Sequence, residues 1–207
     1  MKLLKTVSQG MDENCYITVN ELTNEAMVID PGAEDYKIKE LIDKNELKVK
    51  AILLTHCHYD HIESLRAIKD YTGADVYICS GEQVIAESEN ANLSVYLGGR
   101  PLKAEYDIVA EDNDRFEIGG LNFKVIKTPG HTPGGCCFYF EREGVLFSGD
   151  TLFFMSRGRT DFPYGDEKQL SESITKKLFS LPEDVTVFPG HGPKTTIGME
   201  KKIQADF

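Results

Sequence analysis

The sequence lacks any long apolar segment, and it therefore predicts no membrane-spanning helix. The stretch from Met1 to Lys5 is too short and becomes polar too soon for a signal peptide, which favours a cytoplasmic location. Positive charge is also scarce, because 23 lysines and arginines stand against 34 aspartates and glutamates, a formal net charge of -11. Since nucleic-acid backbones are bound through clustered lysine and arginine, nucleic acid is not expected as the main partner.

Paired CxxC spacing, which is typical of a structural zinc site, is absent as well. The five cysteines are expected to be reduced thiols; they are Cys15, Cys57, Cys79, Cys136 and Cys137. Cys57 stands between His56 and His58, and in an extended segment its side chain points to the opposite face from theirs. We therefore expect Cys57 to pack in the core.

The length and composition suit a single domain over residues 1–207. With 207 residues, of which 41% are hydrophobic, the chain can bury one good core but hardly two. Strands are expected at residues 2–9, 14–19, 26–30, 49–54, 74–79, 116–118, 121–126, 136–140, 145–147 and 185–188, and helices at residues 35–45, 60–71, 169–179 and 199–207. Residues 81–114 are the least regular stretch and are expected to fold over the mouth of a site, and residues 153–166 are expected to be loop.

The most informative stretch is Thr55-His56-Cys57-His58-Tyr59-Asp60-His61, on the loop between a predicted strand and a predicted helix. His56 and His58, two apart in an extended segment, point the same way and can bind one metal ion. Asp60 and His61, at the helix start, turn toward a second point nearby. Imidazole and carboxylate together suit zinc, and also iron or manganese. The pattern therefore predicts a metal site.

Four further loops at strand ends carry residues of the same kinds. His131 lies between two Pro-Gly pairs, and His191 lies in Pro189-Gly190-His191-Gly192-Pro193. Stiff, tightly turned backbone of this composition holds a side chain at a fixed place. Asp30 begins Asp-Pro-Gly, and Asp150 stands in Gly-Asp-Thr, each directly after a predicted strand.

Taken together these motifs resemble the metallo-β-lactamase superfamily. The resemblance rests on His-x-His-x-Asp-His at 56–61, Pro-Gly-His-Thr-Pro-Gly at 129–134, Gly-Asp-Thr-Leu-Phe at 149–153 and Pro-Gly-His-Gly at 189–192. Within that superfamily, Gly158-Arg159-Thr160-Asp161-Phe162 and the stretch 189–198 resemble the short hydroxyacylglutathione hydrolases, or glyoxalase II relatives. The fold class that this implies is α/β, a four-layer αβ/βα sandwich with the metals at one edge.

The resemblance also implies a ligand set of seven residues for two divalent metal ions, zinc before iron or manganese. One ion falls to His56, His58 and His131, the other to Asp60, His61 and His191, and Asp150 bridges them. The implied reaction is attack of a metal-bridging hydroxide on a thioester such as an S-2-hydroxyacylglutathione (S-lactoylglutathione), with Asp60, Asp150 and His191 as the catalytic residues. Asp60 can serve either as ligand or as general base.

Substrate contacts are less specified by the sequence. Asp30 matches a family position that orients ligands, although a strand-ending turn explains it as well. Full-length glyoxalase II enzymes have a helical C-terminal region with basic residues for glutathione, which this sequence does not contain. An anionic substrate group would then be held by Arg157, Arg159, Arg100 or Lys194. Arg159 and Asp161 are expected either to form a structural pair or to contact substrate.

The expected partner is a small molecule, with no nucleic acid and no membrane, and the chain is expected to be a monomer or a homodimer.

Other functions of the same superfamily stay open. Persulfide dioxygenase relatives share the Gly-Arg-Thr-Asp-Phe signature, and they would place one iron on His56, His131 and Asp150. A nuclease is opposed by the acidic charge, and a non-catalytic scaffold by the complete ligand set. β-Lactamases of the commonest class have a cysteine where Asp150 stands, which argues against antibiotic hydrolysis.

Overall fold

Two six-stranded sheets pack face to face in the computed structural model, which describes residues 1–204. The first sheet has the order β1-β2-β3-β4-β5-β6 and the second β14-β13-β10-β9-β8-β7. The first comprises β1 (Lys2–Val7), β2 (Asn14–Val19), β3 (Glu25–Ile29), β4 (Lys48–Leu53), β5 (Asp75–Cys79) and β6 (Ile108–Ala110). The second comprises β7 (Arg115–Ile118), β8 (Leu121–Lys127), β9 (Cys136–Phe140), β10 (Val145–Gly149), β13 (Thr186–Pro189) and β14 (Thr195–Thr196).

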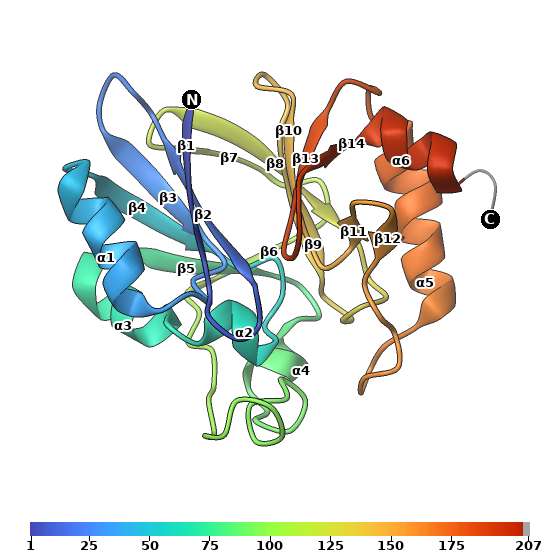
Figure 1. The fold of residues 1–207 in the computed structure, drawn as a ribbon, viewed down its shortest axis with the longest axis horizontal. Coiled ribbons are helices and arrows are strands. Elements are labelled where there is room, and N and C mark those ends of the chain that lie inside the picture. Colours follow the sequence, from blue (N-terminus) through green and yellow to red (C-terminus); the bar gives the residue numbers. More distant parts are fainter. Residues whose placement is uncertain (205–207) are drawn as a thin grey trace.

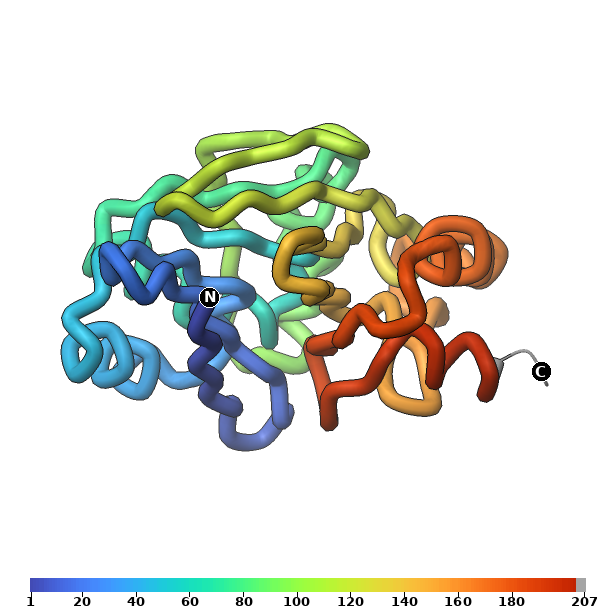
Figure 2. Tube along the Cα trace, turned by 90° about the horizontal axis from the view of Figure 1, so that it is seen from above, coloured from blue at the N-terminus to red at the C-terminus, as the bar shows by residue number. Residues whose placement is uncertain are grey.

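Helices cover the outer face of each sheet. In Figure 1, α1 (Asp35–Lys44) and α3 (Leu65–Thr72) flank the first sheet, and α5 (Glu167–Glu172) and α6 (Ile197–Gln204) flank the second. Seen from above in Figure 2, these two helical layers lie on opposite sides of the molecule with the strands between them. The short helices α2 (Tyr59–Ile62) and α4 (Gln83–Ala86) lie at the end of the sandwich where the loops gather.

Side-chain alternation along the strands fills three apolar layers. Met27 and Leu53 point between the sheets, where they meet Phe138 and Phe147, whereas their neighbours Val28 and Ile52 point toward α1 and α3. A third cluster lies between the second sheet and its helices, formed by Leu146, Val187, Leu170, Ile174, Leu178 and others. The predicted four-layer αβ/βα sandwich is therefore confirmed.

The pairing of the strands follows their order along the chain. Strands β1 to β3 pair antiparallel, and β3 to β6 pair parallel. The predicted strands 116–118 and 121–126 are β7 and β8, which form a hairpin. Strand β6 was not predicted, because it is only three residues long and its middle residue, Val109, is exposed. It also lies in the irregular stretch 81–114, where no periodic hydrophobic pattern indicates a strand.

The predicted helix 60–71 is wrong in one respect, since it divides into α2 and α3. Ser64 lies at the break, where its backbone N–H donates to the carbonyl of Pro31 (2.9 Å) and its hydroxyl to that of Ala33 (2.6 Å). These bonds pull the chain toward the loop after β3. The break therefore lets α2 present Asp60 and His61 independently of the direction of α3.

Further differences from the prediction lie in the second half of the chain. The helix predicted at 169–179 begins two residues earlier as α5 and continues as a π-helical turn, Ser173–Lys177, and a 3-10 turn, Leu178–Ser180. The predicted loop 153–166 contains most of a small hairpin, β11 (Leu152–Phe153) and β12 (Ser156–Arg157). The last helix begins at Ile197 instead of residue 199, and its predicted end at residues 205–207 lies outside the described residues.

All five cysteines are buried and free, and Cys57 packs in the cluster beneath α3, as predicted. Within residues 1–204, helices long and apolar enough to cross a membrane are absent.

Candidate metal centre

Five loops meet at one end of the sandwich, each leaving the end of a strand. They follow β3, β4, β8, β10 and β13, and they carry Asp30, the stretch 56–61, His131, Asp150 and His191 respectively. The last loop is tied to β2, because the side-chain amide of Asn14 donates to the carbonyls of Pro189 and Gly192, each at 2.9 Å. The structure thus brings all seven predicted ligand residues to one place.

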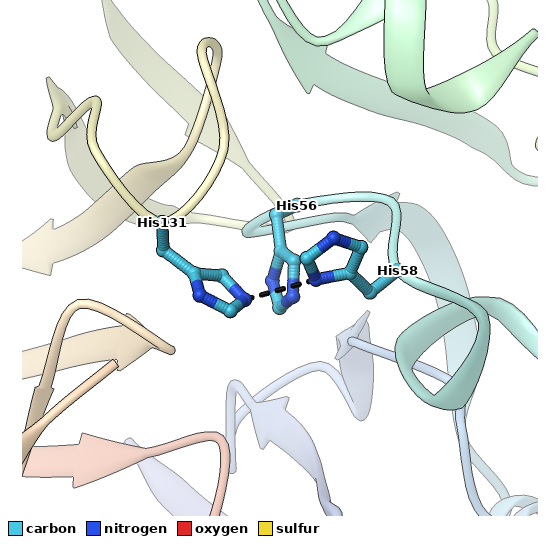
Figure 3. Close-up of side chains that lie close together, drawn as sticks. All are labelled: His56, His58 and His131. Carbon is cyan, nitrogen blue, oxygen red and sulfur yellow. Dashed lines mark hydrogen bonds between the residues drawn. The ribbon is translucent and has the colours of Figure 1, made fainter. Parts of the chain in front are cut away.

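Three histidines form the first group of donors. The nearest ring nitrogens of His56, His58 and His131 all lie within 4.8 Å of one another. Figure 3 shows the rings converging from two loops, with His58 Nδ1 and His131 Nε2 only 2.9 Å apart. The three side chains are buried, with His131 the most exposed at 5%. This group can hold one metal ion.

Two aspartates and the remaining histidines form the second group. Asp60, His61 and His191 lie within the same 4.8 Å limit, and so do His56, His61 and Asp150. Asp60 Oδ2 lies 3.2 Å from His191 Nε2. Asp150 reaches both groups, since its Oδ1 lies 3.4 Å from His61 Nε2 and its Oδ2 lies 3.6 Å from His131 Nε2. Asp150 therefore stands where a shared ligand would have to stand.

Hydrogen bonds to the ring nitrogens that point away from the centre fix the orientation of three histidine rings. His131 Nδ1 donates to the carbonyl of Arg159 at 2.7 Å, and His191 Nδ1 to that of Met11 at 3.1 Å. His61 Nδ1 lies 3.1 Å from Asp30 Oδ2. Such contacts select the tautomer and leave the opposite nitrogen free to bind a metal.

Asp30 is itself held in place. Its two carboxylate oxygens accept from the backbone N–H of Thr55 (2.7 Å) and from the Thr55 hydroxyl (2.6 Å). Thr55 directly precedes His56, so Asp30 joins the loop after β3 to the histidine stretch. The alternative of a simple strand-ending turn does not account for these contacts.

Buried polar atoms without partners show that the residues suit a metal ion. Within the described chain, His56 Nε2, His61 Nε2 and Asp150 Oδ1 are buried and accept or donate no hydrogen bond. Buried polar groups are almost always paired. Orphaned nitrogens and a carboxylate oxygen at one centre are what a divalent cation would satisfy.

The protonation states suit the same role. Burial lowers the pKa of His56, and burial together with the nearby His131 lowers the pKa of His58 to about 3, so both rings are neutral donors. Burial opposes ionisation of Asp60 and Asp150, but the charges and hydrogen bonds of His61 and the neighbouring histidines together outweigh it and hold the pKa of both carboxyls below the usual range. The centre thus combines two neutral imidazoles, His56 and His58, with two ionised carboxylates.

Metal affinity should fall as the pH is lowered. Burial alone would lower the pKa of His61 and His191, but Asp150 and Asp60 raise both above the ordinary value near 6.5. Below those raised pKa values the metal-free rings carry protons that an ion must displace, so binding weakens on acidification and strengthens above them. Calorimetric titration with zinc in buffers of different ionisation enthalpy should show proton release near pH 7. Binding without proton release would contradict this.

A cavity of about 510 Å³ opens onto both groups. Its apolar lining includes Phe153 and Phe162, and Leu93 and Leu97 from the irregular stretch 81–114. That stretch therefore reaches the mouth of the site, where it was expected. Val95 and Tyr96 beside it are exposed.

The two arginines of the lining are both paired. Arg157 Nη2 lies 2.6 Å from Glu167 Oε1, and Arg159 donates two hydrogen bonds to Asp161, at 2.7 and 2.6 Å. The Arg159 guanidinium also lies over the Phe162 ring, 4.0 Å from its centroid. The predicted Arg159–Asp161 pair is present. Arg100 instead donates to the carbonyl of Glu63 (3.4 Å), and Lys194 lies outside the cavity lining.

Sequence reasoning missed two buried acids near the centre. Glu13 pairs through its backbone with His191 in an isolated bridge, and burial raises the pKa of its carboxyl well above the usual range. Glu82 accepts a hydrogen bond from Cys57 N, and burial raises its pKa to about 7. Neither lies in a motif, and the contacts of Glu82 span 25 residues or more.

Gly32 should tolerate no side chain. A Cβ there would lie 1.6 Å from the carbonyl oxygen of Asp60 and 2.7 Å from Glu13 Oε2. Gly32→Ala is therefore expected to displace α2, lower stability by about 1–3 kcal/mol as overpacking does, and reduce zinc content. Thermal unfolding and metal analysis check this against Gly144→Ala, where no atom lies within 4 Å of the added Cβ and only the backbone φ of +64° opposes the side chain. Equal zinc content in both variants would refute it.

Comparison with known proteins agrees with the fold. Residues 10–191 match the Metallo-beta-lactamase superfamily. Hydroxyacylglutathione hydrolase GloC of Haemophilus influenzae is 36% identical over 202 residues, which cover 93% of this chain and 92% of that protein.

Two solved structures show how closely the backbone is shared. The BLEG-1 B3 metallo-beta-lactamase superposes with a TM-score of 0.92 at 37% identity, covering 97% of each chain. TTHA1623 in a di-iron-bound form superposes with a TM-score of 0.85 at 34% identity, covering 97% of this chain and 98% of that one. The similarity therefore extends over nearly the whole length.

Proposed function

This chain belongs to the metallo-beta-lactamase superfamily, and from that premise we propose that it is a hydrolase that binds two divalent metal ions, zinc in the first place, and cleaves small-molecule thioesters. The observation that carries the proposal is the convergence of five histidines and two aspartates, with three buried donor atoms unpartnered. The likeness to hydroxyacylglutathione hydrolase GloC supports the thioester class, with S-lactoylglutathione as the first substrate to test.

The proposed roles follow the geometry. His56, His58 and His131 would hold one ion, Asp60, His61 and His191 the other, and Asp150 both. When bound, such ions lower the pKa of a water to about 7 and polarise the carbonyl that is attacked. Asp60 is only 8% exposed, and its Oδ2 lies 3.2 Å from His191 Nε2, so it is oriented toward the second group as a ligand. Asp30 holds His61 in the required tautomer.

The cavity residues would orient the substrate and keep bulk water out. Leu93 and Leu97 on one side and Phe153 and Phe162 on the other give it apolar walls. A thioester carbonyl can lie between these walls with the sulfur toward Arg157 and Arg159. The leaving thiolate is a weak base, so it needs no proton from the protein at neutral pH. We further propose one hydrolase domain over residues 1–207, acting in the cytoplasm.

The proposal is tested by following thiol release from S-lactoylglutathione and from acyl-coenzyme A and simple alkyl thioesters. We expect turnover with zinc-loaded protein and its loss after chelation, restored by zinc. Nitrocefin belongs in the same assay because BLEG-1 is a B3 metallo-beta-lactamase. Turnover of nitrocefin without turnover of any thioester would replace the proposed substrate class.

Iron-dependent persulfide oxidation is the second candidate, because this chain carries the Gly-Arg-Thr-Asp-Phe signature of the persulfide dioxygenase relatives at residues 158–162 and because the similar TTHA1623 has been solved with iron bound. That reaction would use His56, His131 and Asp150 for one iron. His58 and His191 also point into the centre, which favours two ions. Oxygen uptake with glutathione persulfide, together with one iron per chain and no thiol release, would support this candidate over the hydrolase.

A further inference from the structure

Glu82 connects the two loops that carry the first group of histidines. It follows β5 and begins α4, far in sequence from both loops, and its side chain is fully buried at 0% exposure. The Asp60, His61 and His191 group and its supporting residue Asp30 make no contact with this carboxylate among the hydrogen bonds of residues 1–204.

The two oxygens of Glu82 divide between the loops. Oε1 accepts from the backbone N–H of Cys57 at 2.8 Å, and Cys57 is the residue between His56 and His58. Oε2 accepts from the Thr132 hydroxyl at 2.8 Å and from the Gly134 backbone N–H at 3.0 Å, directly after His131. One carboxylate thus sets the separation of the two loops.

Two glycines, Gly81 and Gly134, allow the backbone next to Glu82 to approach the loop after His131 closely. A Cβ on Gly134 would lie 2.0 Å from the backbone nitrogen of Glu82, and one on Gly81 would lie 3.1 Å from the carbonyl oxygen of Pro133. Gly81 also has a φ of +92°, which residues with side chains rarely adopt. Glycine at both positions is therefore required for the two backbone segments to contact each other.

We propose that Glu82 is a positioning residue that brings His56, His58 and His131 to a common point, so that it supports the first metal ion and not the second. This rests on the proposed function, because it presumes that the two groups each hold an ion. Asp30 is its counterpart for the second ion, through His61 Nδ1. Two buried carboxylates would then each support one half of the centre.

Glu82→Gln tests the role with an isosteric side chain. The amide nitrogen cannot accept a hydrogen bond, so whichever way the amide turns, at least one backbone N–H, of Cys57 or of Gly134, loses its acceptor. We expect the first ion to bind about 10–100-fold more weakly, the usual effect of losing a contact behind a ligand. The second ion should change by less than about threefold.

The measurement is zinc titration of metal-free protein against a chromophoric chelator, which resolves two binding steps. His131→Ala and His191→Ala assign the steps, because each removes a ligand of only one ion. Asp30→Asn is the control, and because Asp30 contacts His61 directly but His56 only through Thr55, it should weaken the second step more than the first. Thr132→Val removes one donor to Oε2 without touching Cys57, and should weaken the first step in the same direction by a smaller factor; it serves if Glu82→Gln does not fold.

The outcomes separate the two proposals. Wild-type protein that takes up fewer than two zinc ions would contradict the binuclear function itself. Two normal steps in the wild type with both steps equally weakened in Glu82→Gln, or with neither changed, would overturn the role of Glu82 alone. If Glu82→Gln does not fold, Thr132→Val replaces it in the test. A first binding step that is unchanged in Thr132→Val would then also overturn the role of Glu82.

Discussion

Replacement of His131 by alanine is expected to lower thioester hydrolysis by about a thousandfold. Its ring stands at the junction of the centre, 2.9 Å from His58 Nδ1 and 3.6 Å from Asp150 Oδ2. Loss of one ligand removes an ion whose charge stabilisation contributes several kcal/mol to the reaction, and about 1.4 kcal/mol corresponds to each factor of ten. The rate constant kcat should fall, and zinc content should drop to about one ion per chain.

The fold should survive this change, because His131 lies on a loop and its neighbours in the strands keep their pairing. Thermal unfolding of the metal-free variant should match that of the metal-free parent within a few degrees. Tyr36→Ala, which removes an exposed aromatic side chain on α1, is the matched control and should leave the rate unchanged. A His131→Ala protein that retains more than a tenth of the parent rate would contradict the assignment.

The second large effect is expected for Asp150→Asn. Within residues 1–204, Asp150 is the one residue whose two oxygens approach histidines of both groups, and despite burial the neighbouring histidines, His61 first among them, together hold its pKa below the usual range. The amide preserves shape and removes the negative charge that would lie between two cations. We expect weaker binding of both ions and a rate loss of about a thousandfold, by the same conversion of several kcal/mol.

Steady-state rates at saturating zinc distinguish the effect of the lost carboxylate charge from the effect of incomplete metal occupancy. If added zinc restored both the stoichiometry and the rate of Asp150→Asn, the carboxylate charge would be dispensable. Asp184→Asn, at an exposed position before β13, is the control for loss of one negative charge and should behave like the parent. The pair therefore isolates the effect of position from that of net charge.

The candidate donor residues could be located from sequence because their loops each follow a short apolar strand, and the resemblance to the superfamily completed the set of seven. The strand ends of the two sheets meet at one end of the sandwich, which brings His56, His131 and His191 together. The alternation of Met27 with Val28, and of Ile52 with Leu53, likewise determined which side chains face the second sheet and which face the helices. Local patterns sufficed for these features.

Features that depend on long-range contacts could not be predicted. The break between α2 and α3 depends on bonds from Ser64 to a loop 31 residues away in the chain. Glu82 carries no local signal, since its partners lie 25 to 52 residues away. Strand β6 and the hairpin of β11 and β12 are too short for a periodic pattern. Strand β6 forms because β5 offers it a free edge, and β11 and β12 form a separate two-stranded sheet.

The most direct test is the metal content of the purified protein by native mass spectrometry, compared with that of His131→Ala and His191→Ala. We predict two divalent ions per chain in the parent protein and about one in each variant, because each replacement removes a ligand of a different ion. A parent protein that holds a single ion, and that keeps it in His191→Ala, would contradict a binuclear centre.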